Sequence, residues 1–234
     1  MTASIFYDPG RHMSHNPKSE FVNALDVIQK GVSPLLKRHG FSVRGRTFNR
    51  TTPERLTHVI KFQMGSYDPP GTTYIPGLRE NLYGKFAVNL GVYVPEVARD
   101  HGGGEAKSIV QEYHCCIRAR LGNLGPERSD IWWSIEQGQS LISDISFRLE
   151  VEALSFLGRF QNREDVLTEL ATDKWSAFVA VPRIVKAVIL VGLSRNSEAE
   201  TLLAAQVNET RNPGHPAYVR RLAEKLGLHL PAGQ

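Results

Sequence analysis

The sequence predicts an α+β fold, a four-stranded antiparallel meander sheet with helices packed on one face and a C-terminal helical annex. In four segments between residues 41 and 121, apolar residues recur at every second position, as in strands with one buried face. From residue 139 onward they recur every three to four positions, as in amphipathic helices. The 234 residues suffice for one large domain with a small extension. We therefore divide the chain into a flexible tail (1–16), a core domain (17–160) and a helical annex (161–234) that packs on the core.

The stretch Lys85–Val94 is expected to be the central strand of the sheet. Its apolar residues alternate and point to the core, whereas Asn89 and Tyr93 point to the other face together with the small residues Ala87 and Gly91. The small residues leave room for a ligand, a partner or the protein's own helical end to approach the strand. Three further strands are predicted at Phe41–Arg50, Leu56–Met64 and Tyr113–Leu121.

Helices are predicted on both sides of the strand region in the sequence. An apolar stripe follows Ser19, and Gly40 is placed to end this helix, with a kink or restart at Pro34. A second helix, Gln139–Phe160, is long enough to cross a sheet. The last two helices resemble a single tetratricopeptide unit, which is expected to act as a cap because stacking needs several repeats. The annex helices are predicted at 163–171, 182–193, 197–207 and 218–226.

Composition and charge exclude several classes of protein. Hydrophobic residues at 41% and charged residues at 22% are ordinary values for a globular domain, and no apolar run is long enough to span a membrane. Because residues 1–7 lack a secretory signal, a cytoplasmic location is expected. The net charge of +4, from 28 basic and 24 acidic residues, leans modestly toward anionic partners.

Cysteine and histidine positions predict no cofactor and no metal centre. Cys115 and Cys116 are adjacent, so on a strand they would face opposite sides and are expected to be reduced thiols. His58 falls on the apolar side of its predicted strand and is expected to be a hydrogen-bonded core residue instead of a ligand.

The polar side of the predicted sheet is the candidate functional surface. In the predicted alternation this side also carries Arg50, Gln63 and the aromatic ring of Phe48. Arginines two positions apart on one strand share a face, so their guanidinium groups could converge on phosphate or carboxylate groups. A plain solvated sheet face is the competing interpretation. The candidate partner-binding residues are Arg44, Arg46, Lys61, Asn89, Tyr93, His114, Arg118 and Arg120.

Four short segments of the core domain share a recognisable pattern. They are Arg44–Phe48, Phe86–Tyr93, Ile117–Gly122 and the pair Trp132 and Trp133. Taken together, these segments resemble a bacterial domain-of-unknown-function family, number 4304, over roughly residues 21–160. The resemblance implies a small bacterial α+β domain that usually stands alone, with no named activity and no catalytic motif to carry over.

Three functions remain open from the sequence. The first is a non-catalytic binding protein that docks an acidic macromolecular partner on the basic sheet face, as an immunity-like or antitoxin-like protein would. The second is a nucleic-acid-binding protein that uses the same face, with Tyr93 and Phe48 for stacking. The third is a phosphoester-processing enzyme in which His114 acts beside arginines that bind the anion. We favour the protein partner, because no carboxylate, nucleophile or metal cluster is expected on the polar side of the strands.

Overall fold

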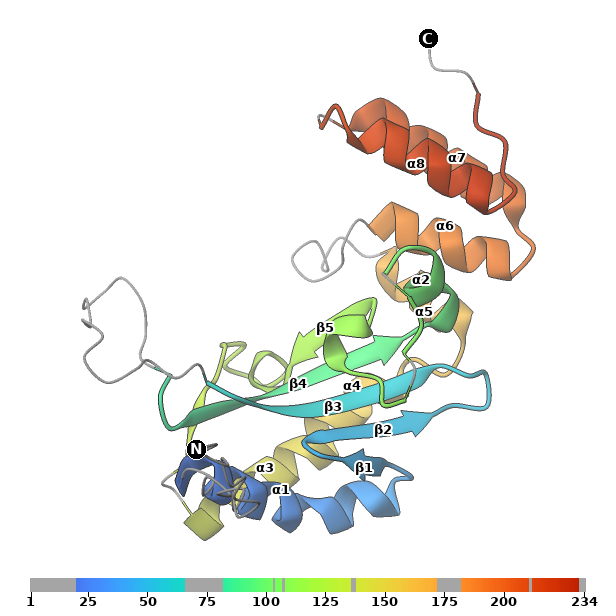
Figure 1. The fold of residues 1–234 in the computed structure, drawn as a ribbon. Coiled ribbons are helices and arrows are strands. Elements are labelled where there is room, and N and C mark those ends of the chain that lie inside the picture. Colours follow the sequence, from blue (N-terminus) through green and yellow to red (C-terminus); the bar gives the residue numbers. More distant parts are fainter. Residues whose placement is uncertain are drawn as a thin grey trace, which may run out of the picture.

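The computed structural model describes residues 20–65, 82–102, 104–106, 108–135, 138–171, 182–210 and 212–231. Within them the protein has the predicted α+β fold, built on an open antiparallel sheet (Figure 1). The sheet order is β1-β2-β3-β4-β5, and β6 pairs with β4 beyond the end of β5. The strands are β1 (Ser42–Arg44), β2 (Thr47–Thr51), β3 (Thr57–Met64), β4 (Lys85–Tyr93), β5 (Ile117–Arg120) and β6 (Trp133–Ser134). The predicted flexible tail, 1–16, lies outside the described residues.

One face of the sheet is covered by helices from both ends of the core region (Figure 1). These are α1 (Glu20–Arg38), α3 (Gly138–Arg148) and α4 (Leu154–Gly158), the last two joined by a π-helical turn, Leu149–Ala153. Their apolar stripes share one core cluster with the inward side chains of the strands. The long helix predicted at 139–160 is therefore confirmed, with one wide turn inserted in it. None of the helices in the described ranges has both the length and the hydropathy that crossing a bilayer requires.

Gly40 ends α1 as predicted. It adopts a φ of +81°, its N–H donates to the Lys37 carbonyl oxygen, and the Phe41 N–H donates to the Leu36 carbonyl oxygen. This pair of hydrogen bonds is the Schellman pattern, which favours glycine at the left-handed position. Pro34 lies inside α1 without ending it.

The first predicted strand is two strands. A two-residue turn at Gly45 and Arg46 separates β1 from β2, and Gly45 takes a φ of +58°, as the first central residue of a type II′ hairpin does. The predicted facing of Phe48 and Arg50 is wrong, because the register opposes Phe48 to Ile60 and puts it, fully buried, in the core cluster. Arg50 shares that side, where it donates to His58.

His58 is a buried core residue, as predicted. Its Nε2 lies 2.7 Å from the Phe160 carbonyl oxygen and its Nδ1 lies 3.0 Å from an Arg50 guanidinium nitrogen. Since the carbonyl only accepts and the guanidinium only donates, the ring is neutral with its proton on Nε2. The pKa of His58 falls from 6.5 to about 4, chiefly because of burial; the Phe160 hydrogen bond opposes the shift and the Arg50 charge adds to it.

The last strand of the meander is shorter than predicted. Residues Glu112–His114 form a 3₁₀ turn, η1, and β5 begins only at Ile117. A second 3₁₀ turn, η2 (Leu121–Asn123), follows β5 directly.

The C-terminal helices lie at one end of the sheet beside α2 (Pro95–Asp100), which follows β4 (Figure 1). Their buried side chains belong to the same core cluster as those of the sheet. They are α5 (Arg163–Leu170), α6 (Pro182–Gly192), α7 (Asn196–Glu209) and α8 (His215–Lys225).

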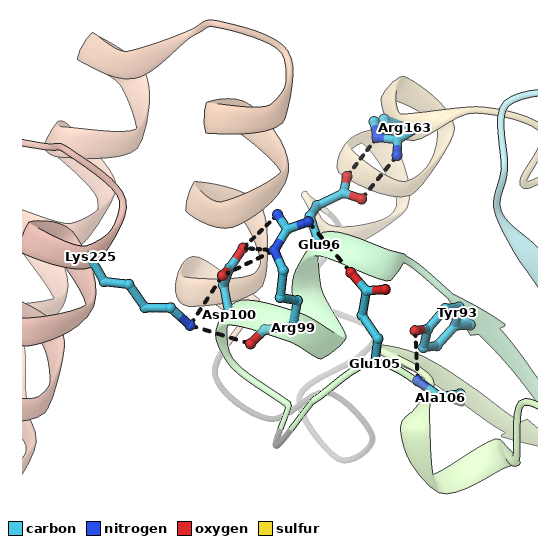
Figure 2. Close-up of polar contacts among 8 residues, drawn as sticks. All are labelled: Tyr93, Glu96, Arg99, Asp100, Glu105, Ala106, Arg163 and Lys225. Atoms are coloured by element: carbon cyan, nitrogen blue, oxygen red, sulfur yellow. Dashed lines mark hydrogen bonds and ion pairs between the residues drawn. The ribbon is translucent and has the colours of Figure 1, made fainter. Parts of the chain in front are cut away.

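Ion pairs join α2 to these helices, as Figure 2 shows. The Arg163 guanidinium donates to both carboxylate oxygens of Glu96, at 2.6 and 2.9 Å, and both side chains are largely buried. Lys225 of α8 reaches Asp100 at 3.1 Å and the Arg99 carbonyl oxygen at 3.3 Å. Since the Glu96 pair is bidentate and shielded from water, it is the strongest polar link at this junction.

We expect the stability of the protein to fall as His58 becomes protonated. The folded state binds this proton less readily than the unfolded state, so acidification from pH 6.5 to about 4 should remove about 3 kcal/mol of unfolding free energy through this residue. Urea unfolding at intervals across that range, compared between the wild type and His58→Gln, measures the effect. Identical pH profiles for the two proteins would contradict the assignment.

Glu96→Gln should lower the unfolding free energy by about 3 kcal/mol, because it leaves the buried Arg163 charge without its counterion. The matched control is Glu209→Gln, which breaks the exposed pair with Arg183 and should cost less than about 1 kcal/mol. Chemical denaturation of both variants at pH 7 gives the comparison. Equal losses would mean that the junction does not depend on the Glu96 pair.

Candidate functional site

The candidate site is on the sheet face opposite α1, α3 and α4, which we call the outer face. Strand register sets one row of side chains across it, because each residue of the row pairs with the next on the neighbouring strand. Strands are about 4.8 Å apart, so a row over five strands spans about 19 Å. The row consists of Arg44, Thr47, Lys61, Asn89 and Arg120.

Asn89 lies at the floor of the outer face instead of projecting from it. It is buried, and its side-chain amide donates to the Gln63 side-chain oxygen at 2.5 Å. This bond ties β4 to β3 and holds the Gln63 side chain beside the row. Asn89 therefore holds Gln63 in place, and the Gln63 side chain is the one of the two that is accessible from the surface.

A carboxylate lies among the cations, which the sequence reasoning missed. Glu112 is only 5% exposed, and its two oxygens accept from Lys61 Nζ at 2.8 Å and from the Arg118 guanidinium at 3.2 Å. The Tyr113 ring, 60% exposed, covers the Lys61 ammonium at 5.1 Å. The expectation of no carboxylate on this face was wrong because Glu112 belongs to a 3₁₀ turn folded over the sheet, where strand alternation does not apply.

The space beside Gly91 is filled by the protein's own chain. A Cβ atom on Gly91 would lie 2.5 Å from Cys115 Sγ, so the turn that carries Glu112 packs directly on β4. Burial raises the pKa of the Cys115 thiol well above its usual range and that of Cys116 to about 12, and both cysteines are free. Such thiols are poor nucleophiles. Tyr93 is enclosed by the same segment, with its hydroxyl oxygen accepting from the Ala106 N–H at 3.2 Å.

The two arginines of β5 differ in how fully their guanidinium groups are hydrogen-bonded within the protein. Arg120 binds both oxygens of Asp130 at 2.7 Å, and its guanidinium lies 4.7 Å from the Trp132 ring centre. Arg118 contacts Glu112 through one nitrogen only, and its side chain is 45% exposed. Arg118 therefore keeps guanidinium N–H groups for a further acceptor.

The remaining arginines flank the row at its β1 end. The prediction that Arg46 points to the outer face is wrong, since its guanidinium turns to α1, where it pairs with Asp26 at 3.1 Å and donates to the Val22 carbonyl oxygen. Arg44 is exposed and forms no ion pair within the described part of the chain. It is thus an unneutralised cation at one end of the outer face.

A hollow of about 590 Å³ opens between the β1–β2 hairpin, the end of β3 and the segment before η1. Three basic residues line it, but Arg46 is paired with Asp26 and Lys61 with Glu112, so Arg44 is the cation that it offers, together with hydroxyl and amide groups. These groups suit an anionic group. The lining residues are Arg44, Gly45, Arg46, Thr47, Lys61, Phe62, Gln63, Met64, Ser108, Ile109 and Gln111.

His114 lies in η1, beside the cations and not on a strand. Its Nδ1 accepts the Gln111 N–H at 3.1 Å, and the Tyr113 ring packs against it at 4.4 Å between ring centres. Among the residues that the structure describes, no group of three or more His, Cys, Asp and Glu side chains is placed to hold a metal ion. The geometry therefore offers anion binding, with His114 engaged in shaping the turn.

The fold and the outer face define an α+β protein with a basic, partly neutralised sheet surface. Residues 79–159 match the model of the family described as Domain of unknown function (DUF4304). The match spans β4, β5, β6 and the long helix, and so contains Glu112, Arg118 and Arg120 but not Arg44 or Lys61. No curated protein and no solved structure showed significant similarity to the chain.

Glu112→Gln should expose the charge of Lys61 and Arg118. We expect affinity for an acidic peptide to rise by a factor on the order of five, the equivalent of about 1 kcal/mol, with a loss of unfolding free energy of about 1–3 kcal/mol. Fluorescence anisotropy with labelled decaglutamate measures the affinity. The control, Glu150→Gln, removes the same charge from an exposed position on the helical side and should leave binding unchanged. An equal rise in affinity in both variants would mean that decaglutamate responds to the net charge of the protein and does not bind at the outer face.

Proposed function

We propose that the outer face binds an acidic segment of a partner protein without catalysing a reaction. The observation that carries the proposal is the register that aligns Arg44, Lys61 and Arg120 in one row, next to the half-exposed Arg118. Arg44 has no counterion among the described residues, and Arg118 has only a single contact. An acidic segment would supply the missing acceptors.

The chemistry of the site favours carboxylates as the groups recognised. Glu112 shows that a side-chain carboxylate fits between Lys61 and Arg118 with hydrogen bonds of ordinary length. One partner carboxylate beside it would use the outward N–H groups of Arg118, and a second, near the β1 end of the row, would use the Arg44 guanidinium. The hollow at the β1 end has room for such a side chain.

Acidic residues among the cations favour a protein partner over a nucleic acid. Glu112 and Asp130 would repel a continuous phosphate backbone, whereas the carboxylates of a protein can be spaced to avoid them. The exposed Tyr113 ring and the Trp132 ring beside Arg120 belong to the residue types that dominate protein interfaces. An immunity-like or antitoxin-like role, in which binding neutralises an acidic partner, agrees with this surface by analogy.

Arg118→Ala combined with Arg120→Ala should abolish partner binding while the fold is kept, since both side chains lie on the surface of an intact sheet. With decaglutamate as the probe at low salt, we expect at least about a tenfold loss of affinity, or about 1.4 kcal/mol. The matched control is Lys37→Ala with Arg38→Ala, which removes two charges from the exposed end of α1. Circular dichroism checks the fold of both proteins.

Two results would reject the proposal. One is equal binding by the outer-face variant and the control variant. The other is tighter binding of a single-stranded oligonucleotide than of decaglutamate, with the steeper salt dependence that multiple phosphate contacts produce.

A further inference from the structure

A second hollow, of about 510 Å³, lies among the C-terminal helices α5, α6 and α7, and we call it the helical groove. Leu167, Leu190 and Leu202, one from each helix, provide its apolar lining together with Ala171. Leu167 and Leu202 are only partly buried, so they present apolar surface to the groove. The other six lining residues are polar or charged: Glu164, Thr168, Lys186, Arg195, Glu198 and Thr201. A hollow of this size that combines apolar surface with placed polar groups is typical of small-molecule sites.

One end of the helical groove is lined by charges that satisfy one another. Arg195 donates to Glu198 at 2.6 and 2.7 Å and to Glu164 at 3.0 and 3.2 Å. These residues meet because α5 and α7 begin and α6 ends at the same level. Two carboxylates against one guanidinium leave this end with a net negative charge.

The other end holds a cation without a counterion. Lys186 lines the groove from α6, is partly buried, and makes no ion pair or hydrogen bond with any residue that the structure describes. From Lys186 to Gly192, where α6 ends just before Arg195, the helix rises by about 9 Å. The groove is therefore lined by leucines and two threonines, Thr168 and Thr201, with a positive charge at the Lys186 end and a net negative charge at the Arg195 end.

The geometry points to the helical groove as a binding site for an amphipathic organic anion, with its acidic head at Lys186 and its alkyl chain on the three leucines. The head cannot reverse, because Glu164 and Glu198 would repel it at the opposite end. The apolar chain removes the leucine surface from water, and the head supplies the counterion that Lys186 lacks. This site is separate from the outer face and does not depend on the function proposed there.

Two ligands with the same chain and opposite head charges test the proposal. Isothermal titration of the full chain below the micelle concentration should show one saturable site for dodecanoate and none for dodecyltrimethylammonium. Lys186→Met, which keeps the aliphatic stem, should weaken dodecanoate binding about fivefold, as expected for a partly exposed ion pair. The control Lys37→Met removes an exposed lysine of α1 and should leave binding unchanged.

A charge placed in the wall should have a larger effect. Leu202→Asp should abolish dodecanoate binding, and circular dichroism shows whether this variant is folded. If it is unfolded, the comparison of the two ligands and the comparison of Lys186→Met with the wild type still test the proposal. Absence of a saturable site, equal binding of both heads, or equal affinity of wild type and Lys186→Met would each overturn the proposal.

Discussion

The pairing of β4 with its neighbours is the constraint on which the other features depend. β4 pairs with β3 along nearly its whole length, with β5 on its other edge and with β6 near its start. Because side chains alternate along a strand, this register decides which residues enter the core and which line the outer face. A slip of one residue would bury Asn89 among the phenylalanines and turn Leu90 to the outer face.

The outer face is less basic than the arginine count suggests, and the reason is local. Glu112 neutralises part of Lys61 and Arg118, Asp130 neutralises Arg120, and Asp26 draws Arg46 to the helical side. What remains available is Arg44 at one end of the row and the outward side of Arg118 near the other. A partner would therefore be recognised by a few placed carboxylates instead of by bulk charge, which gives specificity more than affinity.

The C-terminal helices extend the core of the sheet and also form the helical groove. The buried Glu96–Arg163 pair and the shared apolar cluster join them to α2, while the helical groove is lined by α5, α6 and α7. The outer face and the helical groove have no lining residue in common. A substitution in the lining of one hollow therefore leaves the lining of the other unchanged.

The sequence by itself determined the fold class, the central strand, the helices and the burial of His58. These follow from periodicity and from local signals such as Gly40, which act over a few residues and can be read directly from the chain. The tertiary structure alone decided the side on which Phe48 and Arg50 lie, because the turn at Gly45 breaks the alternation and pairing with β3 sets the register. It also decided that Cys115 fills the space beside Gly91 and that Glu112 lies between Lys61 and Arg118, since these contacts join residues distant in sequence. Local patterns carry no information on such contacts, which arise only when the segment after β4 folds back over the sheet.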